Sequence, residues 1–263
     1  MSEPENRFLA RQKRRTAQLH QLALDRERII LDLMSDLRSS RAEHPVAAPF
    51  PSPYAPIEHR ESVTGKGTTV AFSSLMLQNG LVGPEFANAL SSGWGDVYFV
   101  KDFRRKWFQQ GLSPLTDSRS ETVSLLTELL RDAPRPLRFV GASAGGYAAL
   151  YFGAHLQADS IVAVAPQTLV DRATYDRFQR GSPHDGVFIE DDPENDLASV
   201  LDSTPISGMA HIVFGDDHKI DGPQAERLSG AANVTLHPVV STQHTLLARH
   251  VIKSGLLAEL LST

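Results

Sequence analysis

The sequence predicts an α/β domain in which a mostly parallel β-sheet carries helices on both faces. Short apolar runs, among them "TTVAFSS", "LRFVGAS" and "SIVAVAP", alternate with helical segments such as "SETVSLLTELLRD". Runs that are apolar almost throughout are typical of strands buried on both faces of a parallel sheet. The chain has 263 residues, of which 41% are hydrophobic, so it can enclose a sizeable core around such a sheet.

The chain divides into three zones. Residues 1–43 are expected to form an amphipathic helical arm, because apolar residues such as Ile29 and Leu33 recur at spacings of three and four. This arm can pack on its own domain, or dock on a partner such as a second copy of the chain; a helix on a membrane surface is disfavoured by the acidic residues of its polar face. Residues 44–57 are rich in proline and predict an extended linker. Residues 58–263 form the predicted α/β domain.

The elements of the domain follow one another in a clear order. We expect "IEHRESVTG" to be an antiparallel edge strand, followed by the strands in "TTVAFSS", "DVYFVKD", "LRFVGAS", "SIVAVAP" and "HIVFGDD". "VTLHPVV" is the last predicted strand, before a helical C-terminus. Residues 167–205 are weakly patterned and too long for an ordinary connection between a strand and the next helix. A small lid insertion is therefore expected there.

The composition argues against several functions. A formal net charge of −5 leaves no basic excess to neutralise phosphates, so nucleic acid is not an expected partner. Without cysteine the chain has no disulfides, thiolate zinc sites or cysteine nucleophile. The N-terminal segment lacks the apolar core of a secretory signal, and no stretch reaches the roughly 18 apolar residues of a membrane span. We expect a cytoplasmic protein with no membrane span, cofactor or metal.

One motif carries the candidate chemistry: Gly141-Ala142-Ser143-Ala144-Gly145, between a predicted strand and a predicted helix. Packing alone favours small residues where a helix turns back against a sheet. A nucleophilic serine, however, also needs a tight, strained turn with small neighbours, and parallel sheets place ligand sites at the carboxyl ends of strands. The motif therefore predicts that Ser143 is a nucleophile. It also predicts that the Ala144 N–H, at the helix N-terminus, stabilises an oxyanion.

From about residue 65 to 260 the chain resembles the α/β-hydrolase superfamily. The resemblance rests on the elbow motif followed by an acid and then a histidine, each in a loop after a later strand. More narrowly, "FVGASAGGYAAL", "AVAPQT" and "HTLL" resemble segments of bacterial hydrolase-like proteins linked to cell-surface glycans. The polar lid and the modest apolar content near the elbow favour a short acyl chain, on a sugar or another small molecule, over a long lipid.

The catalytic base is expected to come last, because the order in this fold is serine, acid, histidine. "VTLHPVVSTQHTLLARH" contains His237, His244 and His250. His237 lies inside the predicted strand and His250 inside the predicted helix. His244 lies in the loop between them, so it is the predicted base; capping of the helix is its alternative role.

The acid has several candidates, most of them in "HIVFGDDHKIDGPQAERL" after the penultimate strand. The superfamily spacing favours Asp217. The narrower resemblance favours Asp221, whose alternative role is the N-cap of a helix. Asp216 and Asp171 are the remaining candidates. We prefer Asp221, with Asp217 as the alternative.

A second oxyanion donor is expected in the loop after "TTVAFSS", from the backbone N–H of Ser74 or Leu75. The segment "VKDFRRKWFQQG" follows another strand end. Its Asp102, Arg104, Arg105, Trp107 and Gln109 can shape a substrate pocket, and an arginine there can bind an acidic or sugar-like group. Alternatively, the segment is a solvated helix start with Trp107 packed beneath it.

The predicted activity is cleavage of a carboxyl ester through an acyl-enzyme on Ser143. His244 acts as the base, and Asp221 or Asp217 orients it. Two alternatives stay open: an acyltransferase that uses the same residues, and a non-catalytic scaffold that recruits a partner through its N-terminal helix.

Overall fold

The computed structural model describes residues 55–62, 66–75, 86–90, 93–171, 192–241 and 243–262. All of them belong to one compact unit of the chain, Ala47–Arg180 with Val187–Thr263. The predicted N-terminal arm, nearly all of the predicted linker and the middle of the predicted insertion lie outside the described residues.

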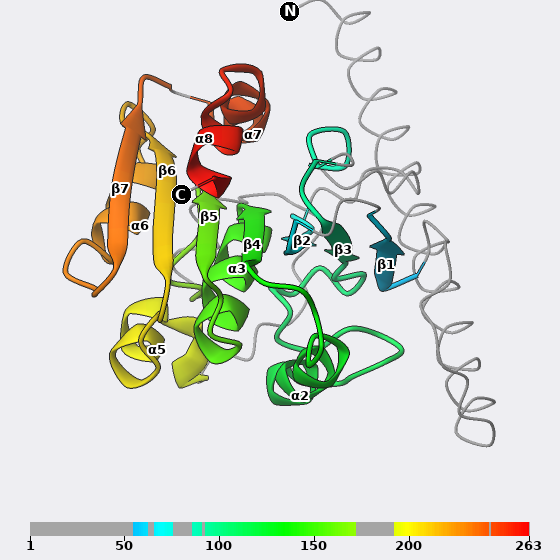
Figure 1. Ribbon diagram of the computed structural model, residues 1–263. Coiled ribbons are helices and arrows are strands. Elements are labelled where there is room, and N and C mark those ends of the chain that lie inside the picture. Colours follow the sequence, from blue (N-terminus) through cyan, green and yellow to red (C-terminus); the bar gives the residue numbers. More distant parts are fainter. Residues whose placement is uncertain are drawn as a thin grey trace, which may run out of the picture. The chain divides into compact units, whose positions relative to one another are not determined.

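The described strands form one seven-stranded sheet in the order β1-β3-β2-β4-β5-β6-β7 (Figure 1). The strands are β1 (Ile57–Arg60), β2 (Thr68–Phe72), β3 (Asp96–Val100), β4 (Leu137–Ala142), β5 (Ser160–Val164), β6 (Met209–Gly215) and β7 (Val234–Val239). Neighbouring strands are parallel except for β1 and β3, which are antiparallel. The predicted fold class, including the antiparallel edge strand, is confirmed. Ile57, the last residue of the predicted linker, already pairs with Val100 in the sheet.

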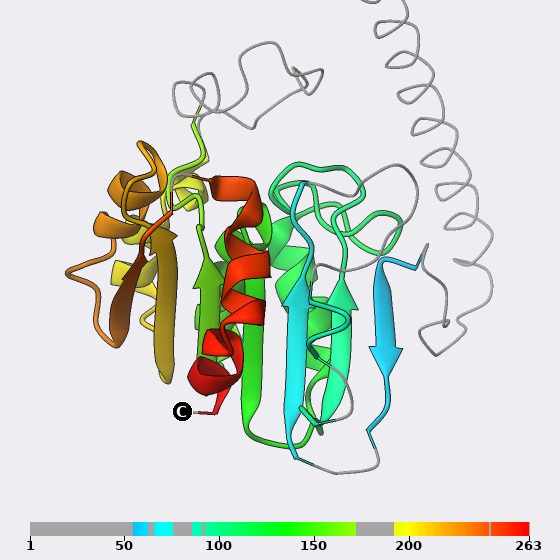
Figure 2. The ribbon, with the colours of Figure 1, turned by 90° about the horizontal axis from the view of Figure 1, so that it is seen from above.

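Helices cover both faces of the sheet (Figure 2). One face carries α2 (Arg119–Leu129), α3 (Ala144–His155), α5 (Leu197–Ser203) and α6 (Asp221–Glu226), and the other carries α7 (His244–Lys253) and α8 (Leu256–Leu261). Successive side chains of a strand point to opposite faces, so Val70 and Phe72 share a core with α3, whereas Ala71 shares one with α7 and α8. Burial on both faces explains the continuously apolar runs. Among the described helices, none has the length and apolar character that crossing a membrane requires.

The last part of the predicted insertion (167–205) differs from a lid. A 3-10 helix (Pro193–Asn195) and α5 follow one another there, and α5 buries Leu197 against the core that it shares with α3. Arg119, which is 2% exposed, binds this segment by donating to the Glu194 carbonyl at 2.8 Å. This part belongs to the helical layer of one face. A helix of 7 residues is too short to show a helical period in the sequence.

Candidate active site

Ser143 lies on the turn between β4 and α3. Its backbone has φ +54° and ψ −118°, a conformation that residues other than glycine rarely adopt. The turn needs glycine at two flanking positions, because a Cβ added to Gly141 would lie 2.0 Å from the Gly145 carbonyl oxygen. A Cβ added to Gly145 would lie 2.4 Å from the carbonyl oxygen of Phe72. The strained turn therefore holds the half-buried Ser143 side chain at the carboxyl end of β4.

Two hydrogen bonds connect Ser143, His244 and Asp221. His244 Nε2 lies 3.0 Å from Ser143 Oγ, and His244 Nδ1 lies 2.8 Å from Asp221 Oδ1. His244 is the first residue of α7, after the loop that follows β7, and Asp221 is the first residue of α6, after β6. His244 thus begins the helix, whereas the sequence predicted it in the loop before the helix. The three side chains come from the segments that follow the carboxyl ends of parallel strands, where α/β sheets collect their ligand sites. When the hydroxyl donates to Nε2, the ring carries its proton on Nδ1 and donates it to the carboxylate.

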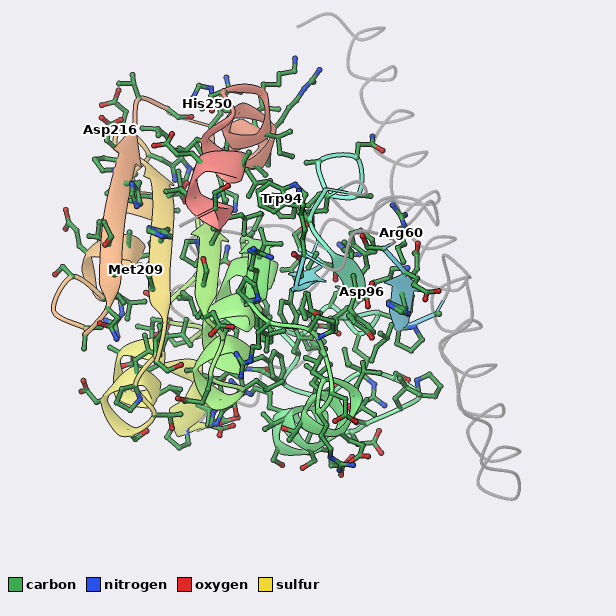
Figure 3. The ribbon with its side chains drawn as sticks, in the orientation of Figure 1. Arg60, Trp94, Asp96, Met209, Asp216 and His250 are labelled. Carbon is green, nitrogen blue, oxygen red and sulfur yellow. The ribbon has the colours of Figure 1, made fainter. Side chains whose placement is uncertain are left out.

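The predicted acids occupy different places. Asp221 is 2% exposed and binds His244. Asp217 and Asp216 are exposed, and Figure 3 shows Asp216 just beyond the end of β6. Asp171 is half-buried, beyond the end of β5. Asp221 is therefore the carboxylate that the structure shows hydrogen-bonded to the predicted base.

The two other candidate histidines lie inside regular elements. His250 is exposed within α7 (Figure 3). His237 lies in β7, with its Nε2 3.0 Å from His211 Nδ1. Burial lowers the pKa of both His211 and His237, and the neighbouring ring lowers that of His211 further. These two rings form a pair of their own within the sheet.

A second imidazole contacts Asp221. His218 Nδ1 lies 2.9 Å from the same Oδ1 that binds His244, and 3.2 Å from the Asp221 backbone nitrogen. A proton on His218 Nδ1 is donated to the carboxylate, whereas an unprotonated Nδ1 accepts from the Asp221 N–H. Asp221 Oδ2 is buried and has no hydrogen-bond partner among the described residues.

These three residues also meet the spacing of a possible metal site. One ligand atom from each of His218, Asp221 and His244 lies within 4.8 Å of the other two. The distances of 2.8 and 2.9 Å from Oδ1 to the imidazole nitrogens are those of hydrogen bonds. Two ligands of a tetrahedral zinc ion, each about 2.0–2.1 Å from the metal, lie about 3.3 Å apart. Hydrogen bonding therefore accounts better for the observed spacing.

The two predicted oxyanion donors lie near the start of α3. Ala144 is the first residue of this helix, so its N–H has no acceptor within the helix. The backbone after β2 passes close by, because a Cβ added to Gly145 would lie 2.9 Å from the carbonyl oxygen of Ser73. Ser74 follows in the chain and is buried. That Ala144 and Ser74 bind an oxyanion stays a prediction.

One residue that sequence reasoning missed also contacts Ser143. Gln167 Nε2 donates to Ser143 Oγ at 2.9 Å, and Gln167 Oε1 accepts from the indole Nε1 of Trp107 at 2.8 Å. Gln167 follows β5 in "AVAPQT", at the end of a parallel strand. A polar side chain at such a strand end was the signal that could have identified it.

The loop that carries Trp107 is built around the buried carboxylate of Asp102. This carboxylate accepts from the backbone N–H groups of Arg105 at 3.0 Å, Lys106 at 2.6 Å and Phe108 at 2.9 Å. Burial raises the pKa of Asp102, and these backbone hydrogen bonds oppose that rise. Arg105, Trp107 and Phe108 have positive φ values of 57°, 50° and 60°. The segment is therefore a strained loop and not a solvated helix start, although Trp107 is buried as that alternative expected.

The two arginines of this loop bind other parts of the protein. Arg104 Nη2 donates to Asp117 Oδ1 at 2.9 Å, and Arg105 Nε donates to the Leu75 carbonyl oxygen at 2.8 Å. Arg105 thereby connects the loop after β3 to the loop after β2. Both contacts stabilise the loop in which Trp107 lies.

A mostly parallel seven-stranded sheet with helices on both faces and a serine on a strained strand-to-helix turn defines the α/β-hydrolase fold, and this chain has that fold. No family model and no curated protein matches the chain. Among solved structures, the capsule O-acetyltransferase of Neisseria meningitidis serogroup A is similar, with a TM-score of 0.60 and 17% identity over 79% of this chain and 90% of that one.

Two further solved structures have the same fold. Carboxyl esterase 2 of the mycorrhizal fungus Tuber melanosporum has a TM-score of 0.52 and 17% identity, covering 78% of each chain. The Paleococcus ferrophilus monoacylglycerol lipase has a TM-score of 0.50 and 14% identity, over 78% of this chain and 98% of that one. At these identities the similarity shows the fold, which is the fold that the resemblance implied.

Proposed function

We propose that the protein is a serine hydrolase that cleaves a carboxyl ester through an acyl-enzyme on Ser143. The supporting observation is the pair of hydrogen bonds from Ser143 Oγ to His244 Nε2 and from His244 Nδ1 to Asp221 Oδ1, at 3.0 and 2.8 Å. The serine and the histidine are 101 positions apart, so their meeting is a product of the fold and not of local chain geometry. A strained turn at the serine supports a catalytic role over a packing role.

In the first half-reaction, Ser143 Oγ attacks the ester carbonyl carbon while its proton moves to His244 Nε2. Asp221 keeps the ring in orientation and stabilises the imidazolium that forms. The carbonyl electrons move onto the oxygen, where the Ala144 N–H, with the Ser74 N–H as second donor, binds the oxyanion. When the intermediate collapses, the bond to the alcohol breaks and the alcohol leaves with the proton from Nε2.

The second half-reaction releases the acyl group to water. His244 takes a proton from a water molecule, and the hydroxide attacks the acyl carbon. Collapse of this intermediate breaks the bond to Ser143 Oγ, which regains a proton from the ring. The acid leaves, and the starting protonation state returns.

For the substrate we favour a short acyl group carried by a sugar or another small molecule. The side chain that contacts Ser143 Oγ beside His244 is the polar carboxamide of Gln167, which is itself bound by the Trp107 indole. Polar groups this close to the reacting oxygen suit a small acyl group better than a long hydrocarbon chain.

An acyltransferase is the second candidate. It shares the first half-reaction and differs in the acceptor, because an alcohol or sugar hydroxyl takes the place of water. The observation that favours it is the TM-score of 0.60 to a structure named as a capsule O-acetyltransferase. This similarity does not identify a substrate for the present chain, but it is the reason to include acceptor alcohols in the assay.

The test compares hydrolysis of p-nitrophenyl acetate and p-nitrophenyl octanoate by the full chain, by Ser143→Ala and by the control Ser120→Ala, which changes an exposed serine on α2. We expect the acetate to be preferred, Ser120→Ala to match the unchanged protein, and Ser143→Ala to lose at least about 10⁴-fold in kcat. Added glycerol or N-acetylhexosamine yields an acylated acceptor only if the enzyme is a transferase. A folded Ser143→Ala with full activity contradicts the proposal. No turnover and no acylation in the unchanged protein favours the scaffold alternative.

A further inference from the structure

Ser143 Oγ has hydrogen bonds to two different segments of the chain. His244 Nε2 reaches it from the start of α7, and Gln167 Nε2 reaches it from the loop after β5. A hydroxyl has one proton to donate and lone pairs with which to accept. Because the carboxamide nitrogen of Gln167 can only donate, Ser143 Oγ accepts from it. The hydroxyl proton is thereby left for His244.

The orientation of the Gln167 carboxamide follows from its other partner. The indole N–H of Trp107 is a donor and never an acceptor. It lies 2.8 Å from one end of the carboxamide, so that end is the oxygen and the NH₂ group faces Ser143. The reverse orientation would set two donors against each other and would draw the Ser143 proton away from His244.

Gln167 is also held firmly in place. It is 6% exposed, and Trp107 is 4% exposed. The next two residues, Thr168 and Leu169, donate their backbone N–H groups to Gln224 Oε1 at 2.6 and 2.9 Å. A buried donor that is fixed before the reaction interacts more strongly with developing charge than a mobile, exposed one.

We propose that Gln167 is a catalytic residue, an inference that rests on the proposed function. Its carboxamide donates to Ser143 Oγ, directs the hydroxyl proton toward His244 Nε2, and stabilises the negative charge that builds on the oxygen as the proton leaves. No bond to Gln167 forms or breaks. The proton moves to His244, and an electron pair of Oγ forms the bond to the acyl carbon.

The first test replaces the donor while keeping the size of the side chain. Gln167→Glu retains an oxygen for the Trp107 indole, but an ionised carboxylate donates nothing and brings negative charge beside Oγ. We measure the rate at which a fluorophosphonate labels Ser143, and kcat/KM for p-nitrophenyl acetate. At pH 8 both are expected to fall by about 10²–10³-fold, the usual effect of removing one such donor.

The pH dependence separates a catalytic from a merely structural role. A glutamic acid has an ordinary pKa of about 4.3, and burial raises it. As the pH falls toward 5, the carboxylate introduced by Gln167→Glu takes up a proton and regains a hydrogen to donate, so the deficit relative to the unchanged protein is expected to narrow. A purely structural defect gives the same deficit at every pH.

Two further variants complete the design. Gln167→Leu removes the donor without adding charge, so its deficit of about 10²-fold is expected to be independent of pH. Gln157→Leu is the control for the substitution itself, because Gln157 is exposed just beyond the C-terminal end of α3, the end opposite Ser143, and donates to the Ala154 carbonyl oxygen at 2.7 Å. It is expected to be labelled at the rate of the unchanged protein.

The outcomes distinguish failure of the inference about Gln167 from failure of the proposed function. An unchanged labelling rate in a folded Gln167→Glu or Gln167→Leu, with native near-UV circular dichroism, overturns the inference and leaves the proposed function standing. If both variants misfold, Trp107→Phe decides: it removes the hydrogen bond that orients Gln167, and about 5-fold slower labelling is expected. A rate equal to that of the unchanged protein then overturns the inference. If the unchanged protein takes no label on Ser143, it is the proposed function that fails.

Discussion

The contacts of Ser143 Oγ with His244 and with Gln167 differ in chemistry and in surroundings. His244 is 20% exposed at its side chain, and it is bound to the carboxylate of Asp221. Gln167 is bound to the Trp107 indole, and neither of these two side chains ionises or is more than 6% exposed. The groups that we propose to move protons and the groups that we propose to bind the serine oxygen therefore come from separate segments of the chain. Each set can therefore be altered without the other.

The largest effect is expected from a substitution of Asp221, the carboxylate that binds His244. Asp221→Asn keeps the shape of the side chain but removes the charge that orients the imidazole and stabilises the imidazolium, so kcat is expected to fall by about 10³–10⁴-fold. Asp217→Asn changes an exposed carboxylate and is expected to stay within about 2-fold of the unchanged protein. Steady-state kinetics on p-nitrophenyl acetate checks both. Equal, small losses of kcat in the two variants would make Asp171 the next candidate for the acid.

The loop that carries Trp107 is tested by Asp102→Asn, which alters this loop without changing Gln167. An asparagine oxygen can replace one acceptor, but its NH₂ group then faces backbone donors. We expect about 2–4 kcal/mol of lost stability, or a Tm lower by about 5–10 °C on calorimetry. Asp202→Asn, at an exposed position, is the control. An unchanged Tm would show that the loop does not depend on this carboxylate.

A substitution of His218 tests whether Asp221 needs a second imidazole contact. His218→Phe removes the ring that lies 2.9 Å from Asp221 Oδ1 and leaves His244 as its imidazole contact. Loss of one of the two imidazole contacts of a carboxylate that keeps its main partner is expected to lower kcat/KM by about 2–5-fold. A gain in activity would instead mean that His218 competes with His244 for the carboxylate.

The pair of His211 and His237, in the sheet, gives the smallest expected effect. Burial lowers the pKa of both rings, so the unfolded chain binds protons before the folded protein does as the pH falls below about 6.5. Their contribution to stability is thus fully present above that pH and is lost below it. His237→Gln removes one titrating ring and is expected to give a shallower fall of Tm between pH 7 and 5, measured by calorimetry. An identical slope contradicts the assignment.

The fold and the contacts among Ser143, His244 and Asp221 can be predicted from the sequence much better than the contacts of Gln167. Strands buried on both faces leave continuous apolar runs, and the position of Ser143 between a strand and a helix is visible in the motif. The position of His244 between the last strand and the last helices, within one residue of where α7 begins, follows from the order of elements. The choice between Asp221 and Asp217 rested on a resemblance, because several carboxylates follow β6 within a few residues.

The strand-end position of Gln167 is visible in the sequence, but its hydrogen bonds to Ser143 and Trp107 are not, since they depend on residues distant in the chain. Trp107 is 60 positions away, in a loop shaped by the buried carboxylate of Asp102 and by three residues with positive φ. Such backbone conformations produce no periodic pattern of apolar residues in the sequence. The short helix α5 was missed for a related reason, because its few buried residues do not show a helical period.

The most direct test of the account is the reaction of the full chain with a fluorophosphonate, followed by peptide mass spectrometry, in the unchanged protein and in His244→Gln. We expect the adduct on Ser143 in the unchanged protein and labelling at least about 10³-fold slower in the variant, since the base that takes the hydroxyl proton is gone. An adduct on another residue, or labelling of Ser143 that does not depend on His244, would contradict the account.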